Sequence, residues 1–232
     1  MDTVAVLPTY NEASNIKQVI EEILNCPIEI CVLIVDDMSP DGTYKIVQEM
    51  AAKNPKINLL LRKEKRGRGY AGIDGFKRAL DMGAKYIVEM DADGSHNPQY
   101  IPALRKAIEN CDAVIGSRYI SGGKDEARNL IRKIISNLSR MYLSFVIGTK
   151  IKDPTSGYRI FKRETLEKFI DKLKASDPFI VTEIVYYLKK NKCLVQEYPI
   201  EFKERLSGES KLKASTLLKY LFKVIKLRLE NI

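Results

Sequence analysis

The chain has 232 residues, of which 45% are hydrophobic and 30% are charged, so it can bury a core and is not disordered by composition. No apolar run reaches the roughly 18 residues that a membrane-spanning helix needs, and the first residues lack the pattern of a secretory signal peptide. The four cysteines form no CxxC pair, so we expect reduced thiols in a cytoplasmic protein.

Charge is divided unevenly along the chain. Residues 1–116 carry 14 Lys or Arg and 17 Asp or Glu, a net charge of −3, whereas residues 117–232 carry 25 and 13, a net charge of +12. A basic surface favours partners that carry phosphate, such as nucleic acid, anionic lipid headgroups or a phosphorylated substrate. A solvated lysine-rich surface is the plainer alternative.

The first half alternates between apolar runs of strand length and amphipathic helical patterns. The predicted strands are residues 4–8, 29–37, 57–61, 86–91 and 112–117, and the predicted helices between them are residues 12–25, 42–54, 70–83 and 98–110. This order predicts an α/β fold with a mostly parallel, Rossmann-like sheet. Because the strands are continuously apolar, we expect helices on both faces of the sheet.

The second half is more helical and more basic. Its predicted helices are residues 128–147, 163–174, 181–191 and 213–232, and its predicted strand is residues 193–205. No linker or repeat divides the chain, so we predict one domain, 1–232, with a first half (1–117) and a basic second half (118–232). The last helix is amphipathic with lysines on one side, which is typical of helices at a membrane interface but also fits a helix packed on the core.

One predicted helix of this half carries a cationic stripe. Arg128, Arg132, Ser136 and Arg140 recur every four residues and therefore share one side of the helix. Arginine binds phosphate oxygens through two parallel hydrogen bonds. The stripe alone fits an ordinary solvated face, but together with the net charge of +12 in this half and the apolar residues beside it, it favours a lipid phosphate as the ligand.

Three acidic loops follow the first, second and fourth predicted strands. They read PTYNE (8–12), DDMSPDGT (36–43) and DADGSHNP (91–98), and together they hold Glu12, Asp36, Asp37, Asp41, Asp91 and Asp93. Each loop alone fits a turn or a helix start. Since the carboxyl ends of parallel strands meet at one edge of the sheet, the carboxylates should lie close enough to need a cation or ligand hydroxyls.

The third of these loops is the best candidate for a metal site. In an extended segment Asp91 and Asp93 would point to the same side, and hard oxygen ligands suit Mg²⁺ or Mn²⁺ held jointly with phosphates. A calcium EF-hand is excluded because His96 and Pro102 stand where that loop needs glycine and glutamate. A zinc site is excluded because the chain has a single histidine and scattered cysteines.

These loops belong to a longer ordered set of blocks that covers nearly the whole chain. The further blocks are GSRYISGG (116–123), RKIISNLSR (132–140), DPTSGYRIFKRE (153–164) and ERLSGESKL (204–212). The set resembles the family 2 glycosyltransferases of GT-A fold, and within them the dolichyl-phosphate mannose synthases and related polyprenyl-phosphate hexosyltransferases. The resemblance implies metal-dependent, inverting transfer of mannose from GDP-mannose, or alternatively of glucose from UDP-glucose, to a polyprenyl or dolichyl phosphate.

The resemblance also implies roles for individual residues. The implied donor-binding residues are Pro8, Tyr10, Glu12, Val35, Asp37, Asp91, Ala92, Asp93, Arg205 and Lys211. The implied ligands of Mg²⁺ or Mn²⁺ are Asp91, Asp93 and Ser95, where many relatives carry glutamine in place of the serine. The implied acceptor-phosphate residues are Arg118, Arg132, Ser136 and Arg205. The implied catalytic residues are Asp93, Arg118 and Asp153, the last as an orienting group or a base.

The same resemblance implies a place at the membrane. The acceptor is a membrane lipid, so we expect the protein to lie on the cytoplasmic face of the membrane as a peripheral protein, with a transmembrane accessory subunit as one further partner. We expect no nucleic acid as a partner.

Two other functions compete with this interpretation. The segment GRGYAG (67–72) matches the G-x-G-x-x-G pattern of NAD-binding oxidoreductases. Against it, the charged residues 62–66 separate the preceding strand from Gly67, whereas the dinucleotide turn is tight. A nucleic-acid-binding module would fit the isoelectric point of 9.2, and it would need aromatic residues among the basic ones of the second half. Tyr119, Tyr142 and Tyr158 are available, but they fall within blocks that the resemblance already explains.

Overall fold

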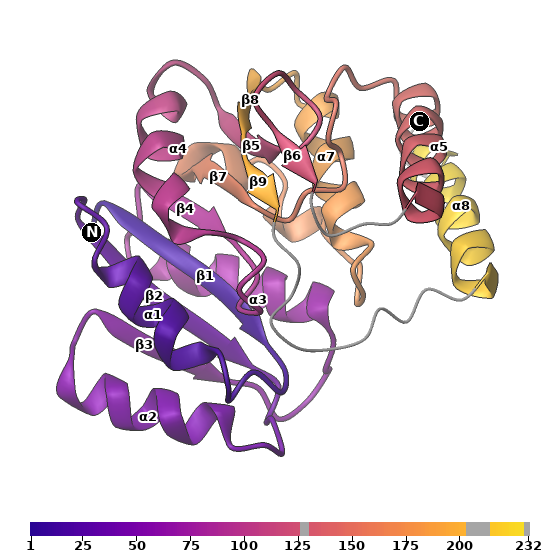
Figure 1. The fold of residues 1–232 in the computed structure, drawn as a ribbon. Helices are drawn as coiled ribbons and strands as arrows, with labels where there is room; N and C mark the ends of the chain where they lie inside the picture. Colours follow the sequence, from indigo (N-terminus) through magenta and orange to yellow (C-terminus); the bar gives the residue numbers. More distant parts are fainter. Residues whose placement is uncertain (126–129, 203–213, 230–232) are drawn as a thin grey trace.

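The computed structural model describes residues 1–125, 130–202 and 214–229 (Figure 1). For residues 130–136 and 214–218 it describes the backbone alone. One sheet has seven strands in the order β3-β2-β1-β4-β7-β5-β8, and a smaller parallel sheet pairs β6 with β9. The strands are β1 (Thr3–Thr9), β2 (Ile30–Asp36), β3 (Ile57–Leu61), β4 (Tyr86–Glu89), β5 (Ala113–Ser117), β6 (Lys124–Asp125), β7 (Arg159–Lys162), β8 (Val195–Pro199) and β9 (Glu201–Phe202). In the large sheet, β7 runs antiparallel to β4 and β5, and the other neighbours are parallel.

Helices cover both faces of the large sheet. They are α1 (Ile16–Leu24), α2 (Thr43–Lys53), α3 (Arg68–Asp81), α4 (Ile101–Ala107), α5 (Leu130–Ile147), α6 (Arg163–Glu167), α7 (Ile180–Lys190) and α8 (Ala214–Leu229), with short 3₁₀ turns at Pro98–Tyr100, Ile108–Asn110 and Ile170–Lys172. The core on one face is formed with α1, α2 and α4, and the core on the other face with α3, α6 and α7. The predicted α/β fold with a sheet covered on both sides is therefore confirmed.

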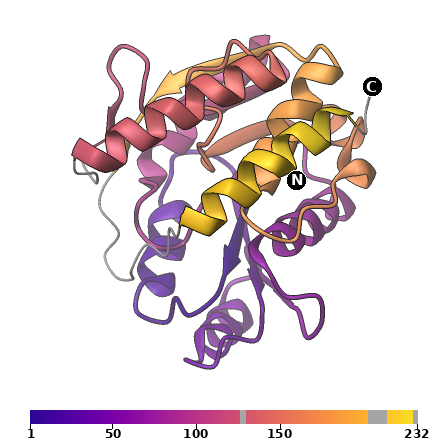
Figure 2. The same ribbon diagram turned by 90° about the vertical axis from the view of Figure 1, so that its right-hand side faces the viewer.

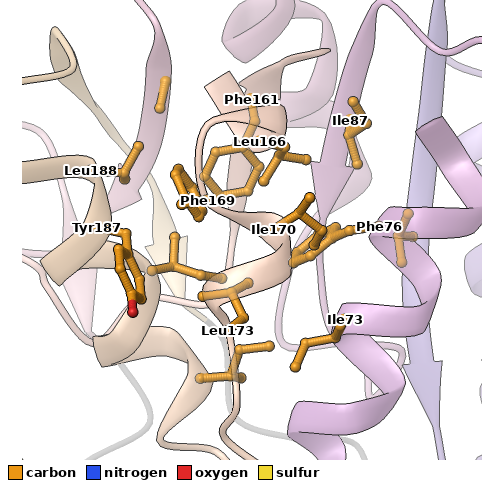
Figure 3. Close-up of a cluster of buried hydrophobic side chains, with 14 of the residues drawn as sticks. Ile73, Phe76, Ile87, Phe161, Leu166, Phe169, Ile170, Leu173, Tyr187 and Leu188 are labelled. Atoms are coloured by element: carbon orange, nitrogen blue, oxygen red, sulfur yellow. The ribbon is translucent and has the colours of Figure 1, made fainter. Parts of the chain in front are cut away.

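Strand side chains alternate between these two cores. In β1 the side chains of Val4 and Val6 join the core beneath α3, whereas those of Ala5 and Leu7 join the core beneath α1. On the α3 side, the ring of Phe76 packs edge-on against that of Phe161 in β7, with the ring centres 5.9 Å apart. Figure 3 shows this cluster, in which helix α3 meets the segment that follows β7.

Helices α5 and α8 pack against each other at the margin of the second half (Figure 2). The Tyr142 hydroxyl of α5 donates a hydrogen bond of 2.8 Å to the backbone oxygen of Leu221 in α8. Several large apolar side chains of helices α5 and α8 are exposed to solvent, namely Leu138, Met141, Phe145, Phe222, Ile225 and Leu229. Among the helices that the structure describes, none combines the length and the apolar content needed to cross a membrane.

The structure departs from the predicted elements in the region between β4 and β5. Strand β7 was not predicted, yet it lies between β4 and β5 and pairs with both. The predicted strand 193–205 divides into β8 and β9, and the predicted strand 86–91 ends at Glu89. Because β7 is antiparallel to its neighbours, β5 runs parallel to β1, β2 and β4, so the residues that follow these four strands meet at one edge of the sheet.

Candidate active site

A cavity of about 390 Å³ opens at this edge, next to the ends of β1 and β2. That volume lies within the range of small-molecule sites. The lining residues are Pro8, Thr9, Tyr10, Asp37, Arg66, Gly67, Arg68 and Ala71. The structure thus brings together Pro8, Tyr10 and Asp37, three of the residues implied to bind the donor. Tyr10 is half exposed at the rim, where its ring can stack on a planar ligand.

Asp37 is held rigidly in the wall of this cavity. It is buried, forms an ion pair with Arg62, and accepts a hydrogen bond of 2.7 Å from the backbone nitrogen of Gly67. Arg62 is itself fixed by a hydrogen bond of 2.7 Å to Asp74. The cavity wall therefore joins the end of β2 to the start of α3 through paired charges.

The other acidic residues of the first two loops hold the backbone rather than a ligand. Asp36 accepts hydrogen bonds from the Thr9 hydroxyl at 2.9 Å and from the Ser39 nitrogen at 2.8 Å. Asp41 accepts hydrogen bonds from the Ala13 nitrogen at 2.9 Å and from the Thr43 hydroxyl at 2.6 Å. Because local donors satisfy Asp36 and Asp41, these two carboxylates do not need the cation or ligand hydroxyls expected for the acidic loops.

Two other implied donor residues lie outside the cavity wall. Val35 is fully buried in the core beneath α3. The Glu12 backbone nitrogen donates a hydrogen bond of 2.9 Å to the Thr43 hydroxyl, and its carboxylate accepts one of 3.0 Å from Asn15. Val35 is thus part of the core and Glu12 stabilises the loop after β1, and the contact of either residue with a donor stays a prediction.

The loop after β4 is compact and bent. The Asp93 carboxylate accepts hydrogen bonds from the backbone nitrogen of Ser95 at 3.1 Å and from its hydroxyl at 2.6 Å. Ala92, Asp93 and Ser95 are buried, whereas a third of the Asp91 side chain is exposed. Since β4 ends at Glu89, the extended geometry assumed for Asp91 and Asp93 does not apply, and a turn fixes the direction of Asp93 instead.

His96, the single histidine of the chain, anchors the backbone of this loop. Its Nδ1 accepts a hydrogen bond of 2.9 Å from the backbone nitrogen of Asp91, so the ring is neutral with its proton on Nε2. The ring stacks on Tyr158 with the ring centres 5.0 Å apart. Burial lowers the pKa of His96, although the nearby carboxylates of Asp91 and Asp93 oppose this effect.

The carboxylates of this loop suit an Mg²⁺ or Mn²⁺ ion that is also bound by water and substrate phosphates, and they are too few to hold a metal by themselves. Within residues 1–125, 130–202 and 214–229, no three acidic, histidine or cysteine side chains lie close enough to hold a metal by themselves. Mg²⁺ typically binds through one or two carboxylates together with waters and substrate phosphates. Asp91 and Asp93 supply that number of hard oxygen ligands beside a cavity of nucleotide size.

Arg118 and Asp153 form a buried ion pair at the end of β5. Arg118 donates hydrogen bonds of 2.8 Å from Nε and Nη2 to the two oxygens of Asp153, which is fully buried. Burial disfavours the charge of Asp153, but the hydrogen bonds from Arg118 prevail and hold its pKa below the ordinary value. With its carboxylate enclosed in this way, Asp153 is suited to orient Arg118 and not to accept a proton from a substrate.

One aromatic ring links this pair to the acidic loop. The ring of Phe202 in β9 lies edge-on to His96 at 5.6 Å between centres, and the Arg118 guanidinium lies 5.1 Å from the centre of the same ring. Arg68, in the cavity wall, donates a hydrogen bond of 3.2 Å to Asp91. The cavity, the acidic loop and the Arg118–Asp153 pair are therefore parts of one continuous site.

Several implied residues fall outside this description. Arg132 and Ser136 lie on α5, but their side chains are outside the described residues, as are Arg205 and Lys211 altogether. Of the predicted cationic stripe, the side chain of Arg140 is described. The Arg140 guanidinium lies 3.6 Å from the centre of the ring of Tyr119, the residue that follows Arg118 in the chain.

Residues 66–68 line the cavity, whereas the sequence pattern of segment 66–69 indicates only the glycine spacing of a dinucleotide turn. A side chain at Gly67 would lie 2.3 Å from the backbone oxygen of Ser176, and one at Gly69 would lie 2.1 Å from that of Ala175. Gly67 also has a φ of +137°, which side chains rarely allow. These glycines therefore permit close packing of α3 on the loop before α7, which accounts for the G-x-G spacing without a dinucleotide.

Comparison with known proteins places the chain in a family. The family model described as "Glycosyl transferase family 2" matches residues 4–170. The chain belongs to glycosyltransferase family 2. This membership confirms the resemblance seen in the sequence, and it decides against the oxidoreductase and the nucleic-acid-binding module.

Individual relatives narrow the comparison. The polyprenol monophosphomannose synthase of Mycolicibacterium smegmatis is 35% identical over 225 residues, which cover 96% of this chain and 85% of that protein. The dolichol-phosphate mannosyltransferase of Pyrococcus furiosus is 37% identical over 232 residues, and the chain spans 64% of its length. Among solved structures, glucosyl-3-phosphoglycerate synthase from Mycobacterium tuberculosis, in complex with Mn²⁺, UDP and glucosyl-3-phosphoglycerate, superposes with a TM-score of 0.67 at 18% identity, covering 99% of this chain and 79% of that one. The chain described here therefore has the GT-A fold, like these glycosyltransferases.

Proposed function

We propose that this family 2 glycosyltransferase transfers mannose from GDP-mannose to a polyprenyl phosphate. The observation that carries the proposal is the continuity of the site, because the cavity meets the Asp91 loop through Arg68, and that loop meets Arg118 through Phe202. A donor in the cavity would thus have its diphosphate beside the acidic loop and its sugar toward a buried arginine. The two mannosyltransferase relatives support mannose as the sugar and a polyprenyl phosphate as the acceptor.

In this proposal the donor site is built from the first half of the chain. The nucleoside lies in the 390 Å³ cavity with its base against the Tyr10 ring, and the paired charges of Asp37 and Arg62 keep the wall in place. Asp91 and Asp93 hold Mg²⁺ or Mn²⁺, and Ser95 orients Asp93 through its hydroxyl. The bound metal supplies positive charge where the diphosphate leaves. The Mn²⁺ and UDP bound by the M. tuberculosis synthase support a divalent cation here.

The acceptor site is built from the second half. Arg118 binds the lipid phosphate in an orientation fixed by Asp153. Arg132, Arg205 and Lys211 add positive charge around the two substrates, and the Ser136 hydroxyl donates a hydrogen bond to the acceptor phosphate. A phosphate monoester is already largely ionised near neutral pH, so the acceptor needs to be aimed and not deprotonated. The enclosed, ionised state of Asp153 is consistent with this requirement. Attack from the side opposite the diphosphate inverts the configuration of the sugar.

Helices α5 and α8 supply the contact with the membrane surface. Phe145 and Phe222 are 85% and 71% exposed, and lysines and arginines accompany such side chains on both helices. Apolar side chains flanked by basic ones bind the interface of an anionic bilayer. We propose that the protein lies there as a peripheral protein on the cytoplasmic face, and association with a transmembrane subunit stays a prediction.

A transfer assay with extraction into organic solvent tests the function. The purified protein is incubated with polyprenyl phosphate, Mg²⁺ or Mn²⁺, and either labelled GDP-mannose or labelled UDP-glucose. We expect label in the organic phase with GDP-mannose and its loss when the metal is chelated. Transfer from UDP-glucose alone would replace the proposed donor, and no transfer from either would refute the proposal.

Substitution of the acidic loop tests the proposed metal site separately. Asp93→Ala is expected to reduce transfer by about two orders of magnitude or more, the usual scale for the loss of one preorganised charge contact to a transition state. The control is Asp171→Ala, because that carboxylate is 83% exposed and pairs with Lys77 on the surface. If Asp93→Ala keeps both activity and metal dependence, the assignment of the metal to this loop fails.

A further inference from the structure

Arg68 is placed unlike any other described cation of the site. It stands at the first position of α3 and lines the nucleotide-sized cavity, yet its guanidinium reaches the end of β4. There the nitrogen Nη2 donates hydrogen bonds to Glu89 at 3.0 Å and to Asp91 at 3.2 Å. One nitrogen atom therefore joins two carboxylates that are two residues apart in the chain.

The two carboxylates differ in their surroundings. Glu89 is fully buried, and a third of the Asp91 side chain is exposed at the site. Arg159 stands opposite Glu89 in the pairing of β4 with β7, but it donates its hydrogen bonds to the backbone oxygens of Ser156 at 2.6 Å and Pro154 at 3.4 Å. Within the described part of the chain, Arg68 is thus the residue that forms ion pairs with both Glu89 and Asp91.

This arrangement fixes the direction of Asp91. Arginine keeps its positive charge in proteins, so the guanidinium is a cation placed between the carboxylates of Glu89 and Asp91. Glu89 cannot turn to solvent, and it therefore anchors the guanidinium that holds Asp91. His96 also holds the Asp91 backbone, because its Nδ1 accepts a hydrogen bond of 2.9 Å from the Asp91 nitrogen.

We infer that Arg68 is a positioning residue for sugar transfer, which orients Asp91 toward the donor by bridging it to the buried Glu89; this inference rests on the proposed role of Asp91 in metal binding. Arg68 acts through Asp91 and not by contact with the reacting atoms. It also ties the acidic loop to the helix that lines the nucleotide cavity, so the metal site and the nucleoside site keep a fixed relative position.

The variant Arg68→Lys tests the inference while keeping the charge. Lysine is shorter by about one bond, so its ammonium nitrogen cannot reach the position that Nη2 occupies between the two carboxylates, although it keeps the positive charge. With the local charge unchanged, we expect kcat to fall about tenfold and the dissociation constant of Mn²⁺ in the presence of GDP to rise about fivefold, because small displacements of a reacting constellation are costly. The donor KM at saturating Mn²⁺ should stay within about threefold of the wild-type value.

The matched control is Arg105→Lys. Arg105 makes a comparable ion pair of 3.0 Å with Asp2, and its guanidinium lies 3.6 Å from the centre of the Tyr86 ring, away from the cavity. This variant should keep the wild-type kcat and Mn²⁺ affinity. If Arg68→Lys matches the control in both quantities, the inference is overturned.

A second variant decides the matter if Arg68→Lys does not fold. Glu89→Gln keeps one oxygen for Nη2 but removes the charge that anchors the guanidinium, so both kcat and Mn²⁺ affinity should fall in the same direction by smaller factors. Wild-type values for both would overturn the inference. The proposed function is judged on the wild-type protein alone, since absence of mannose transfer or of Mn²⁺ binding there refutes that proposal independently of any variant.

Discussion

Asp153→Asn is expected to destabilise the protein strongly, because it removes the negative partner of a buried cation. Arg118 is 5% exposed and Asp153 is fully buried, and the two form hydrogen bonds of 2.8 Å through both carboxylate oxygens. Removing one partner of such a pair costs about 3–5 kcal/mol, since the other charge stays buried without compensation. For a domain of this size each kcal/mol lowers the melting temperature by about 2–4 °C, so we expect a fall of about 6–20 °C.

The loss of unfolding free energy in Asp153→Asn should depend on pH. The pKa of Asp153 is held below its ordinary value of 3.8, despite burial, by the hydrogen bonds from Arg118. On acidification the unfolded chain therefore takes up the proton before the folded protein does, so the stabilisation is complete above the unfolded pKa and is lost as the pH falls through the folded pKa. The difference in unfolding free energy between wild type and Asp153→Asn should be constant down to about pH 5 and should narrow below about pH 4.

Urea unfolding followed by circular dichroism at pH 7, 5 and 3.5 measures this difference. The control is Asp171→Asn, which changes a carboxylate that is 83% exposed and pairs with Lys77 at the surface. Its unfolding free energy should stay close to the wild-type value at every pH. A loss below about 1 kcal/mol for Asp153→Asn at pH 7, or a loss that does not narrow in acid, would refute the buried-pair reasoning.

Three further predictions concern the acidic loop, the start of α3 and the α5–α8 pair. Ser95→Ala removes the hydroxyl that donates a hydrogen bond of 2.6 Å to Asp93, so kcat should fall about tenfold, which is less than in Asp93→Ala. An equal loss of kcat in the two variants would contradict a merely orienting role for Ser95. Gly69→Ala places a methyl group 2.1 Å from a backbone oxygen, so thermal unfolding should report a loss of at least about 1–3 kcal/mol. Phe145→Ser combined with Phe222→Ser should weaken sedimentation with anionic vesicles by at least about tenfold at an unchanged melting temperature, since both rings are exposed.

The edge of the sheet that carries the site could be predicted because its signal is local. Apolar runs ending in acidic loops locate the ends of β1, β2 and β4, and the structure brings Pro8, Tyr10 and Asp37 to one cavity. The roles of the individual carboxylates could not be predicted in the same way. Whether an aspartate binds a ligand or its own loop depends on the donors around it, as the Thr9 and Ser39 contacts of Asp36 illustrate.

Contacts made across the fold were also beyond the sequence. Arg68 and Asp91 are 23 residues apart, and nothing in the pattern of either segment indicates that they meet. Strand β7 has four residues with Arg159 and Lys162 at its ends, which is a weak strand signal. Arg159 is fully buried and donates a hydrogen bond to the backbone oxygen of Ser156, and this is a tertiary contact that the sequence pattern does not indicate.

The position of β7 has a consequence for how the protein folds. The strand belongs to the basic second half of the chain, yet it completes the sheet between β4 and β5 of the acidic first half. Neither half can therefore finish its hydrogen bonding without the other, and a cut near residue 117 would leave unpaired strand edges on both fragments. The donor and acceptor sides should form and unfold in a single cooperative transition, and movement of one side relative to the other is confined to loops, because a hinge between the halves would have to break the sheet.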